Sequence, residues 1–311
     1  MQQHFTLFVL LSLILFNACS QPQQPQQIRI GYLAVTSNLP LFVALEKKMF
    51  EQQGLQVELK KFESSNLLGQ ALVSGAIDID AGTSSFVGLG LAQTSAEKMK
   101  IFLSIVASEK NFMSSLLVKP EISSLQQLQN KKVGCFPGAA IKTFTMMFLK
   151  KNNAWGEQSR LVELPPPLQL QALENGSVDA VMCVEPTGTL ARVTGKAKVL
   201  MHGPIEHDIF PQWTGGYYSF NADFIKNNPE IARKLYDIFA QSLEEIRNDM
   251  QAARKTLLTY TPIQQEAIAQ AVSIPEFTMG NTLDTQGFST VADTLVHYGI
   301  LTQKPALQWY R

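Results

Sequence analysis

Residues 70–79 read Gln-Ala-Leu-Val-Ser-Gly-Ala-Ile-Asp-Ile, and residues 171–180 read Gln-Ala-Leu-Glu-Asn-Gly-Ser-Val-Asp-Ala. In both copies a short helical run ends at a glycine, a common helix terminator, and an apolar strand follows. A second landmark, the strand that contains Gly31, is repeated by the strand that contains Gly134. The displacements are 171 − 70 = 101 and 134 − 31 = 103. Two landmarks that recur in order at nearly one spacing predict two similar lobes, although any α/β chain can reuse such units.

The segments around the first copy alternate between strand and helix patterns. Residues 28–32 alternate in polarity, 39–50 carry apolar residues at helical spacing, and 55–62 predict the next strand. With the helix before Gly75 and the strand from Ile77, the order is strand, helix, strand, helix, strand. This order is typical of a mostly parallel sheet covered by helices, so the predicted fold class is α/β.

Two strand-like connectors are expected to join the lobes, at residues 112–118 and 215–220. Because the chain then crosses twice, residues 28–112 plus 217–311 are assigned to the first lobe and 113–216 to the second. The pattern after the second connector is helical, so the carboxyl-terminal helices return to the first lobe. Two lobes joined by two strands can hinge.

The amino terminus has the layout of a secretion signal followed by a tether. Residues 5–16 form an apolar run that is too short to span a bilayer but long enough for the core of a signal peptide. Ala18 and Cys19 resemble the end of a lipoprotein cleavage box, so we expect a signal peptide over 1–19 and acylation of Cys19, with simple cleavage or retention as alternatives. A Gln- and Pro-rich tether over 20–27 follows. This layout predicts an extracytoplasmic protein that a lipid anchor holds at a membrane.

Composition excludes several classes of protein. The chain carries 26 Lys and Arg against 26 Asp and Glu, without a long basic run, so no nucleic-acid partner is expected. A hydrophobic fraction of 45% excludes a disordered body. Three cysteines without paired spacing exclude a disulfide scaffold and a zinc site, and Cys135 and Cys183 are expected to be free buried thiols. We predict neither a metal nor a cofactor.

Four loops are candidates for a ligand site. In an open parallel sheet the carboxyl ends of the strands face a crevice, where the following helices present unpaired N–H groups. Small residues occupy these positions in both lobes: Ser37, Asn38, Thr83, Ser84, Ser85, Gly138 and Ala139. Each could serve only as a helix cap, because these residue types cap helices in many proteins. Their convergence from equivalent places in two lobes favours a site.

Glu185 and three aromatic residues complete the candidate site. An apolar strand delivers Glu185 to the predicted crevice, where its carboxylate would accept hydrogen bonds from an amine or an amino-heterocycle. The alternative is that Glu185 caps the helix that follows. Tyr32, Trp213 and Tyr217 lie at strand ends and connectors, where their rings could stack on a flat ligand or form ordinary core.

Several segments resemble a known family of binding proteins. They are 28–32, 40–44, 50–55, 72–78 and 125–134, followed by the pair Glu185-Pro186. In this order they are similar to the substrate-binding proteins of ABC importers for nitrate, sulfonates, taurine and thiamine pyrimidine precursors. The resemblance covers about residues 28–298 and implies a type II periplasmic-binding fold. Two lobes of that fold close on a small molecule and present it to a permease with its ATPase, and a monomer is expected.

The resemblance leaves the ligand open. Glu185 and the aromatic residues are slightly closer to the pyrimidine-precursor branch, and a sulfonate, taurine or nitrate is the alternative. A related enzyme makes the thiamine pyrimidine with histidine and a cysteine-rich iron motif. This chain has four His and no cysteine cluster, so no enzymatic activity is expected. A sensory protein that serves another partner is a further alternative.

Overall fold

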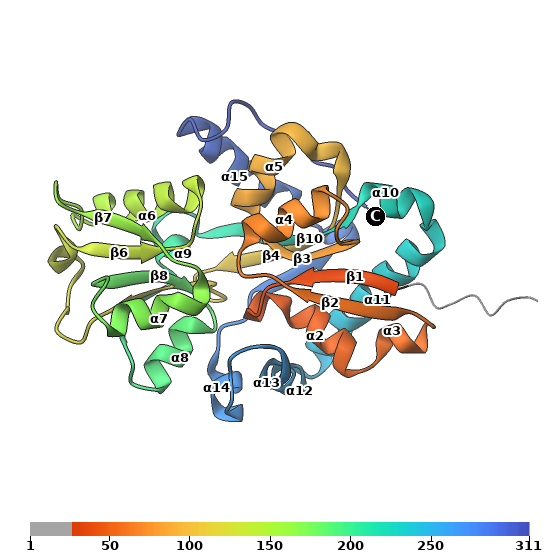
Figure 1. Ribbon diagram of the computed structural model, residues 1–311, viewed down its shortest axis with the longest axis horizontal. Coiled ribbons are helices and arrows are strands. Elements are labelled where there is room, and N and C mark those ends of the chain that lie inside the picture. The colour runs from red at the N-terminus through yellow and green to blue at the C-terminus, as the bar shows by residue number, and fades with distance from the viewer. Residues whose placement is uncertain (1–26, 311) are drawn as a thin grey trace, which may run out of the picture.

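Two β-sheets organise residues 27–310, the part of the chain that the structure, a computed structural model, describes. The strands of the first sheet are β1 (Gln27–Tyr32), β2 (Gln56–Lys61), β3 (Ile79–Ser84), β4 (Met99–Ser108), β10 (Gln212–Asn221) and β11 (Glu276–Met279). Those of the second are β5 (Ser114–Val118), β6 (Lys132–Cys135), β7 (Arg160–Glu163), β8 (Ala180–Val184) and β9 (Lys198–His202). Figure 1 shows one lobe around each sheet, which confirms the predicted two-lobed α/β architecture.

Helices cover the sheets of both lobes (Figure 1). The first lobe contains η1 (Thr36–Asn38), α2 (Leu39–Glu46), α3 (Met49–Gln52), α4 (Ser65–Val73), α5 (Ser85–Ser95), η2 (Ala96–Lys98), α10 (Ala222–Asn227), α11 (Pro229–Asn248), α12 (Met250–Lys255), α13 (Leu257–Tyr260), α14 (Glu266–Ala271), η4 (Gly280–Thr282) and α15 (Thr285–His297). The second contains η3 (Leu125–Leu128), α6 (Ala139–Lys151), α7 (Pro166–Glu174), α8 (Thr187–Val193) and α9 (Pro204–Asp208). Of the carboxyl-terminal helices, α15 packs on β10 of the first sheet.

The two sheets are mixed, whereas the sequence pattern predicts mostly parallel ones. The strands of the repeated units do pair in parallel, β1 with β2 and β3, and β6 with β7 and β8. The connector strands add antiparallel pairs, β10 with β3 and β4, and β5 with β8 and β9. A connector that re-enters a lobe from the other side runs against the strands already there, so local sequence pattern does not reveal its direction.

The two copies of the internal repeat also make equivalent contacts. Asp78 and Asp179 hold equivalent places, and the Oδ2 atom of each accepts a hydrogen bond from the backbone of the neighbouring strand, from Arg29 N at 2.8 Å and from Lys132 N at 3.0 Å. The Oδ1 atom of each pairs with a cation, Arg29 at 2.6 Å and Lys119 at 3.0 Å. The recurring aspartate therefore ties two parallel strands together at the same point of each lobe.

The landmark glycines lie where a helix or loop packs closely on the strand. A Cβ atom on Gly31 would lie 2.6 Å from Leu68 Cδ1, and one on Gly134 would lie 2.8 Å from Leu164 Cδ1. Real Cβ atoms do not approach so closely, so a side chain at either position would require the facing leucine to shift.

The two lobes are linked by neighbouring segments. Strands β4 and β10 pair from Met99 with Asn221 to Ser108 with Gln212, so the ends of these two strands that lead to the second lobe lie side by side. The predicted boundary between residues 216 and 217 falls inside β10, all of which belongs to the first sheet. The division into lobes at those residues, and hinging between them, stay predictions.

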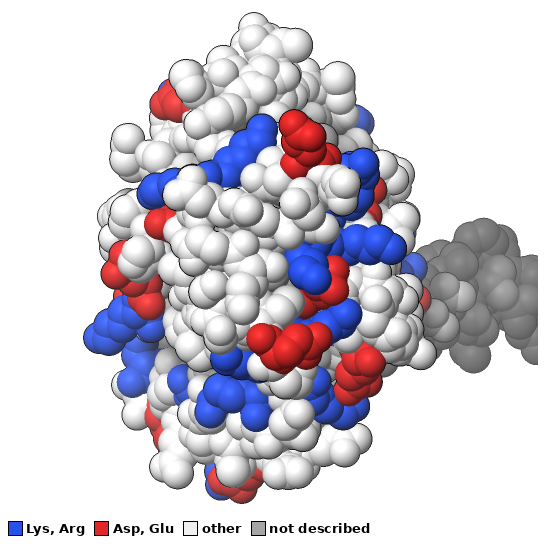
Figure 2. Space-filling model, turned by 90° about the vertical axis from the view of Figure 1, so that its left-hand side faces the viewer, with Lys and Arg blue, Asp and Glu red and all other residues white. Residues whose placement is uncertain are grey.

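Several features of the sequence fall outside this description. The predicted signal peptide, Cys19 and the tether before Gln27 lie outside the described residues, and Gln27 is the first residue of β1. Among residues 27–310, no helix combines the length and the apolar character that crossing a membrane requires. Figure 2, which faces the outer end of the second lobe, shows acidic and basic side chains interspersed.

Candidate functional site

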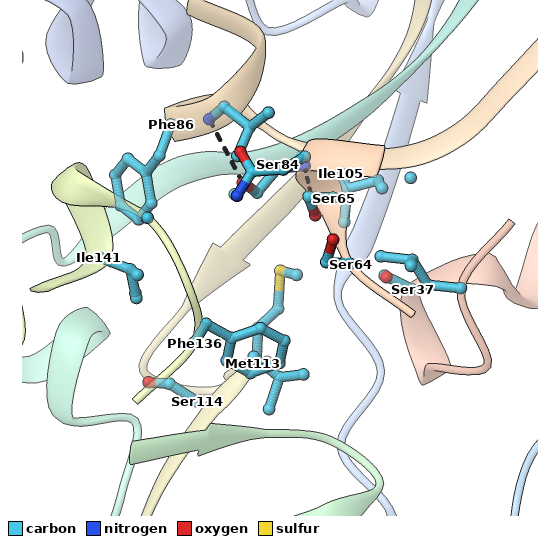
Figure 3. Close-up of a pocket in the computed structure, with 18 of the residues that line it drawn as sticks. Ser37, Ser64, Ser65, Ser84, Phe86, Ile105, Met113, Ser114, Phe136 and Ile141 are labelled. Atoms are coloured by element: carbon cyan, nitrogen blue, oxygen red, sulfur yellow. Dashed lines mark hydrogen bonds between the residues drawn. The ribbon is translucent and has the colours of Figure 1, made fainter. Parts of the chain in front are cut away.

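A cavity of about 380 Å³ lies between the two lobes (Figure 3). The first lobe contributes residues from the loop after β1, from the start of α4 and from α5, and the second contributes the loop after β6 and helix α9. Two hydrogen bonds cross between the lobes, from Asn66 Nδ2 to Pro137 O and from Thr36 N to Glu185 O, both at 3.4 Å. Because both lobes contribute residues to the wall, a molecule in the cavity contacts both lobes.

One side of the cavity is rich in hydroxyl groups at two helix N-termini. Ser64 Oγ accepts Leu67 N at the start of α4, and Ser84 Oγ accepts Val87 N at the start of α5, both at 3.4 Å. Ser65 Oγ accepts the N–H of Ser84 at 3.3 Å and so joins the two helix ends. The first turns of helices carry unpaired N–H groups and the positive end of the helix dipole. This side of the cavity therefore favours an anionic group.

The rest of the wall is mainly apolar and aromatic. Phe86 stacks between Phe144, with ring centroids 4.6 Å apart, and Trp213, with centroids 5.0 Å apart. Phe86 and Trp213 line the cavity together with Ile105, Met113, Phe136 and Ile141. Trp213 is 4% exposed, and its Nε1 has no hydrogen-bond partner among the described residues. The indole nevertheless interacts with the carboxylate of Glu206, described next, and lowers the pKa of that group.

Glu206 is the one ionisable side chain among the described residues that line the cavity. It is fully buried on α9, where Oε1 accepts Met113 N at 3.1 Å and Oε2 accepts Ser114 Oγ at 2.5 Å. Burial raises the pKa of Glu206, an effect that these hydrogen bonds and the nearby Trp213 indole partly offset. Through these two hydrogen bonds, Glu206 links helix α9 of the second lobe to Met113 and Ser114 of the first connector.

The structure brings some of the predicted site residues to the cavity. Those that line it are Ser37, Ser84, Gly138 and Trp213. Ala139 begins α6 directly after Gly138, and its side chain is outside the described part of the structure. Those that are not part of the wall are Tyr32, Asn38, Thr83, Ser85, Glu185 and Tyr217. Participation of any of them in binding stays a prediction.

Glu185 serves as a helix cap, the alternative that the sequence left open. It is 1% exposed, and its Oε2 accepts Thr189 N in the first turn of α8 at 3.2 Å, while Oε1 accepts Ser115 Oγ at 3.2 Å. Burial raises the pKa of Glu185. The carboxylate therefore turns into the second lobe and is not part of the cavity wall, and a role for it in binding stays a prediction.

Three more of the predicted residues are not part of the wall. Thr83 is fully buried while Ser84 lines the cavity, because successive residues of a strand point to opposite sides, and Ser85, the first residue of α5, is also fully buried. Tyr217 points away, with its hydroxyl 3.8 Å from Met99 Sδ beneath α5.

Tyr32 and Asn38 are held within the first lobe by local contacts. The ring of Tyr32 packs edge-on against Phe42 with centroids 5.8 Å apart. Asn38 is fully buried, and its Nδ2 donates to Leu33 O at 2.5 Å. These side chains shape the loop after β1 from behind the cavity wall.

Several residues of the cavity wall are not among the site residues predicted from the sequence. Ser64, Ser65 and Asn66 precede an apolar helical run, so the helix-start pattern Ser-Ser-Asn was a usable signal. Phe86 directly follows the predicted loop that ends at Ser85, and Phe136 lies two residues before Gly138 of another. Glu206 has no such signal, because the short helix that carries it reaches the cavity only through tertiary packing.

The cysteines and acidic residues do not form a reactive or metal site in the described chain. Cys135 and Cys183 are both free and buried, as predicted, and burial raises the pKa of Cys135 to about 12. Among residues 27–310, no group of three or more His, Cys, Asp and Glu side chains is arranged to hold a metal ion.

The chain is similar to known binding proteins in sequence and in structure. The model of the NMT1-like family matches residues 21–259. The taurine-binding periplasmic protein of Escherichia coli is 25% identical over 235 residues, which cover 73% of this chain and 67% of that protein. Other curated relatives are matched over 65% of their own length.

Solved structures share the two-lobed fold. The alkanesulfonate-binding protein SsuA of Xanthomonas axonopodis pv. citri, bound to MOPS, superposes with a TM-score of 0.73 at 20% identity, covering 91% of this chain and 96% of that one. The nitrate-binding protein NrtA of Synechocystis PCC 6803 superposes with a TM-score of 0.67 at 12% identity, covering 89% of this chain and 83% of that one.

Proposed function

The chain belongs to the NMT1-like family, and we propose that it is the solute-binding protein of an ABC importer that captures a small organic sulfonate between its lobes. The observation that carries the proposal is the cavity whose walls come from both lobes. A ligand held by both lobes stabilises the closed arrangement over an open one, and a permease can recognise that difference. No catalytic step is part of the proposal.

The sulfonate class is supported by the cavity and by relatives. The hydroxyl side, with Ser64, Ser65 and Ser84 at the starts of α4 and α5, offers hydrogen-bond donors to a group with three anionic oxygens. Two of the named relatives bind taurine or an alkanesulfonate, and the Xanthomonas protein was solved with MOPS, itself a sulfonate. A thiamine pyrimidine precursor loses its main support, because Glu185 caps α8 instead of facing the cavity.

The cellular setting of the proposal follows from the predicted leader. We propose that the protein works outside the cytoplasm as a monomer, anchored to a membrane by acylated Cys19 and delivering its ligand to a permease with its ATPase. The residues from Cys19 to the first strand would serve as the tether. Release of the protein from membranes after Cys19→Ala, with the leader otherwise intact, tests the anchor.

Gly90→Leu is expected to abolish ligand binding while the protein stays folded. Gly90 is an exposed residue of α5 on the cavity wall, and no atom lies within 4 Å of a Cβ placed on it, so a leucine there would fill open space at the cavity. Leucine also favours helix over glycine by roughly 0.5–1 kcal/mol, so thermal stability should not fall. The measurement is thermal shift and tryptophan fluorescence with taurine, larger alkanesulfonates, MOPS, nitrate and hydroxymethylpyrimidine.

The controls separate the classes of ligand. A sulfonate at about 100 times its Kd should stabilise the unmodified protein by about 2.7 kcal/mol. Gly90→Ala, which adds one methyl group in open space, should keep the response. If only hydroxymethylpyrimidine or only nitrate stabilised the protein, the ligand would not be a sulfonate. If Gly90→Leu bound the ligand as well as the unmodified protein does, the cavity would not be the binding site.

A further inference from the structure

The carboxyl-terminal segment that follows α15 forms part of the cavity wall. Ile300 and Leu301 line the cavity, and Leu301 is buried in the apolar cluster that also contains Phe86 and Trp213. Ile300 packs against the same cluster. The match to the family model ends at residue 259, so this piece of wall comes from a part of the chain beyond that match. It is a feature by which the cavity of this protein can differ from those of its relatives.

Hydrogen bonds hold this segment on the first lobe. The N–H groups of Ile300 and Leu301 donate to Leu295 O of α15, at 2.9 and 3.2 Å. The Oε1 atom of Gln93 on α5 accepts both Thr302 N, at 3.1 Å, and Thr302 Oγ1, at 2.8 Å. Because the segment is attached to both α15 and α5, it presents a fixed surface to the cavity.

The segment lies at the apolar end of the cavity. Leu301 shares its cluster with Phe86, and Figure 3 shows Phe86 and Ile141 on one side of the cavity and Ser37 and Ser64 on the other. No Lys, Arg or His is among the described wall residues, so a second anionic group on a ligand would find no counter-charge. A volume of about 380 Å³ is within the range of pockets that bind drug-sized molecules. A solute with its polar head at the hydroxyl side therefore has room for an apolar tail that points toward the segment.

Resting on the proposed function, we infer that Ile300 and Leu301 are specificity-determining residues, which set the largest apolar tail that the cavity accepts. The sulfonate lies at the hydroxyl side, and the tail extends across the cavity until its end contacts these two side chains. A shorter tail leaves apolar wall uncovered, and a longer tail meets a fixed surface. Affinity therefore has a maximum at one tail length.

Linear alkane-1-sulfonates, from ethanesulfonate to decanesulfonate, measure this length. Titration calorimetry on the full protein should show an affinity that rises about fourfold with each added methylene group, as expected for its burial, and that falls once the tail exceeds the distance to the wall. A continuous rise up to decanesulfonate would show that no wall limits the tail. That result would overturn the inference and leave sulfonate capture intact, and it needs no variant.

Leu301→Ala and Ile300→Phe change the wall in opposite directions. The alanine removes the branched end of the leucine side chain, so the maximum should move to a tail about two carbons longer, which Leu301→Ala should bind roughly tenfold more tightly than the unmodified protein does. The phenylalanine adds volume and should move the maximum to a shorter tail. Ile300 is only partly buried, so Ile300→Phe keeps the test available if Leu301→Ala folds poorly.

Leu295→Ala is the matched control. Leu295 is buried in the same apolar cluster but is not among the wall residues, so this variant should lose stability without moving the maximum. A purely structural role of Leu301 would likewise lower stability and leave the preferred tail length unchanged. If the maximum stays at the same length in both Leu301→Ala and Ile300→Phe, the inference is wrong.

A parallel series of linear alkan-1-ols separates the inference from the sulfonate class. If no sulfonate binds, but alcohols bind with a length maximum that Leu301→Ala moves to longer tails, the sulfonate proposal is wrong and the role of Ile300 and Leu301 is supported. If neither series binds, both proposals are wrong.

Discussion

Replacing Asp80 with asparagine should stabilise the protein at pH 8 by up to about 4 kcal/mol, an unusual direction for a change in a fully buried polar residue. Burial raises the pKa of Asp80 from 3.8 to about 7. One oxygen accepts Thr83 N at 3.0 Å, and the other has no partner in the described structure. Asparagine keeps an oxygen for Thr83 and carries no charge to bury.

The direction of the stability change follows from the way protonation of Asp80 depends on pH. The folded state holds the Asp80 proton more tightly than the unfolded chain does, so the free energy of unfolding is highest below about pH 4 and falls as the pH rises toward about 7. Asp80→Asn should therefore gain stability relative to the unmodified protein across this range and keep a constant advantage above it. Urea unfolding at several pH values measures the difference.

Asp179→Asn is the control, and we expect it to lower the free energy of unfolding at pH 8 instead of raising it. The pKa of Asp179 is lowered because its hydrogen bonds with Lys132 and Lys119 and the charges of Lys119 and Lys131 outweigh partial burial. Its contribution to stability is present at neutral pH and is lost as the pH falls through the lowered pKa, so the asparagine variant should be less stable at pH 8. A pH-independent effect of Asp80→Asn, or a loss of stability at pH 8, would contradict the assignment of an uncompensated carboxyl.

Phe144→Ala is expected to cost about 3–5 kcal/mol of folding stability and, in addition, to weaken ligand binding by about tenfold. Phe144 on α6 of the second lobe is fully buried and stacks on Phe86 of the first lobe, with ring centroids 4.6 Å apart. Both belong to an apolar cluster with Phe210 and Trp213 that extends across the lobes. If the lobes separate in the free protein, this contact belongs to the closed arrangement and contributes to affinity.

Phe148→Ala, one turn further along α6, is the matched control. Phe148 is equally buried, but its cluster is composed of residues of the second lobe. We expect a similar loss of stability with unchanged affinity, measured by calorimetry at a temperature where both variants are folded. Equal affinities of the two variants would show that the aromatic cluster stays closed during binding, and the hinge would have to act elsewhere.

Much of the architecture follows from local pattern. The repeat around Gly75 and Gly176 specifies a helix, a turn and a strand through spacing alone, and the structure shows positive φ angles of 75° and 78° at these glycines. Helix and strand periodicities are short-range properties, so two copies in one chain predict two lobes. The loops that hold Ser37, Ser84 and Gly138 could be found in the same way, as residues between a strand and a helix.

The binding chemistry depends on which side of the wall each side chain faces, and that is a property of packing. Ser84 reaches the cavity while Thr83 and Ser85 do not, Glu185 turns to cap α8, and Glu206 arrives from a five-residue helix distant in sequence from the other walls. Residue type and spacing constrain the backbone within one element, but the direction of a side chain relative to another lobe is decided by contacts among residues far apart in the chain. Hence the lobes were readable from sequence, whereas the acidic group in the cavity became visible only once the chain was folded.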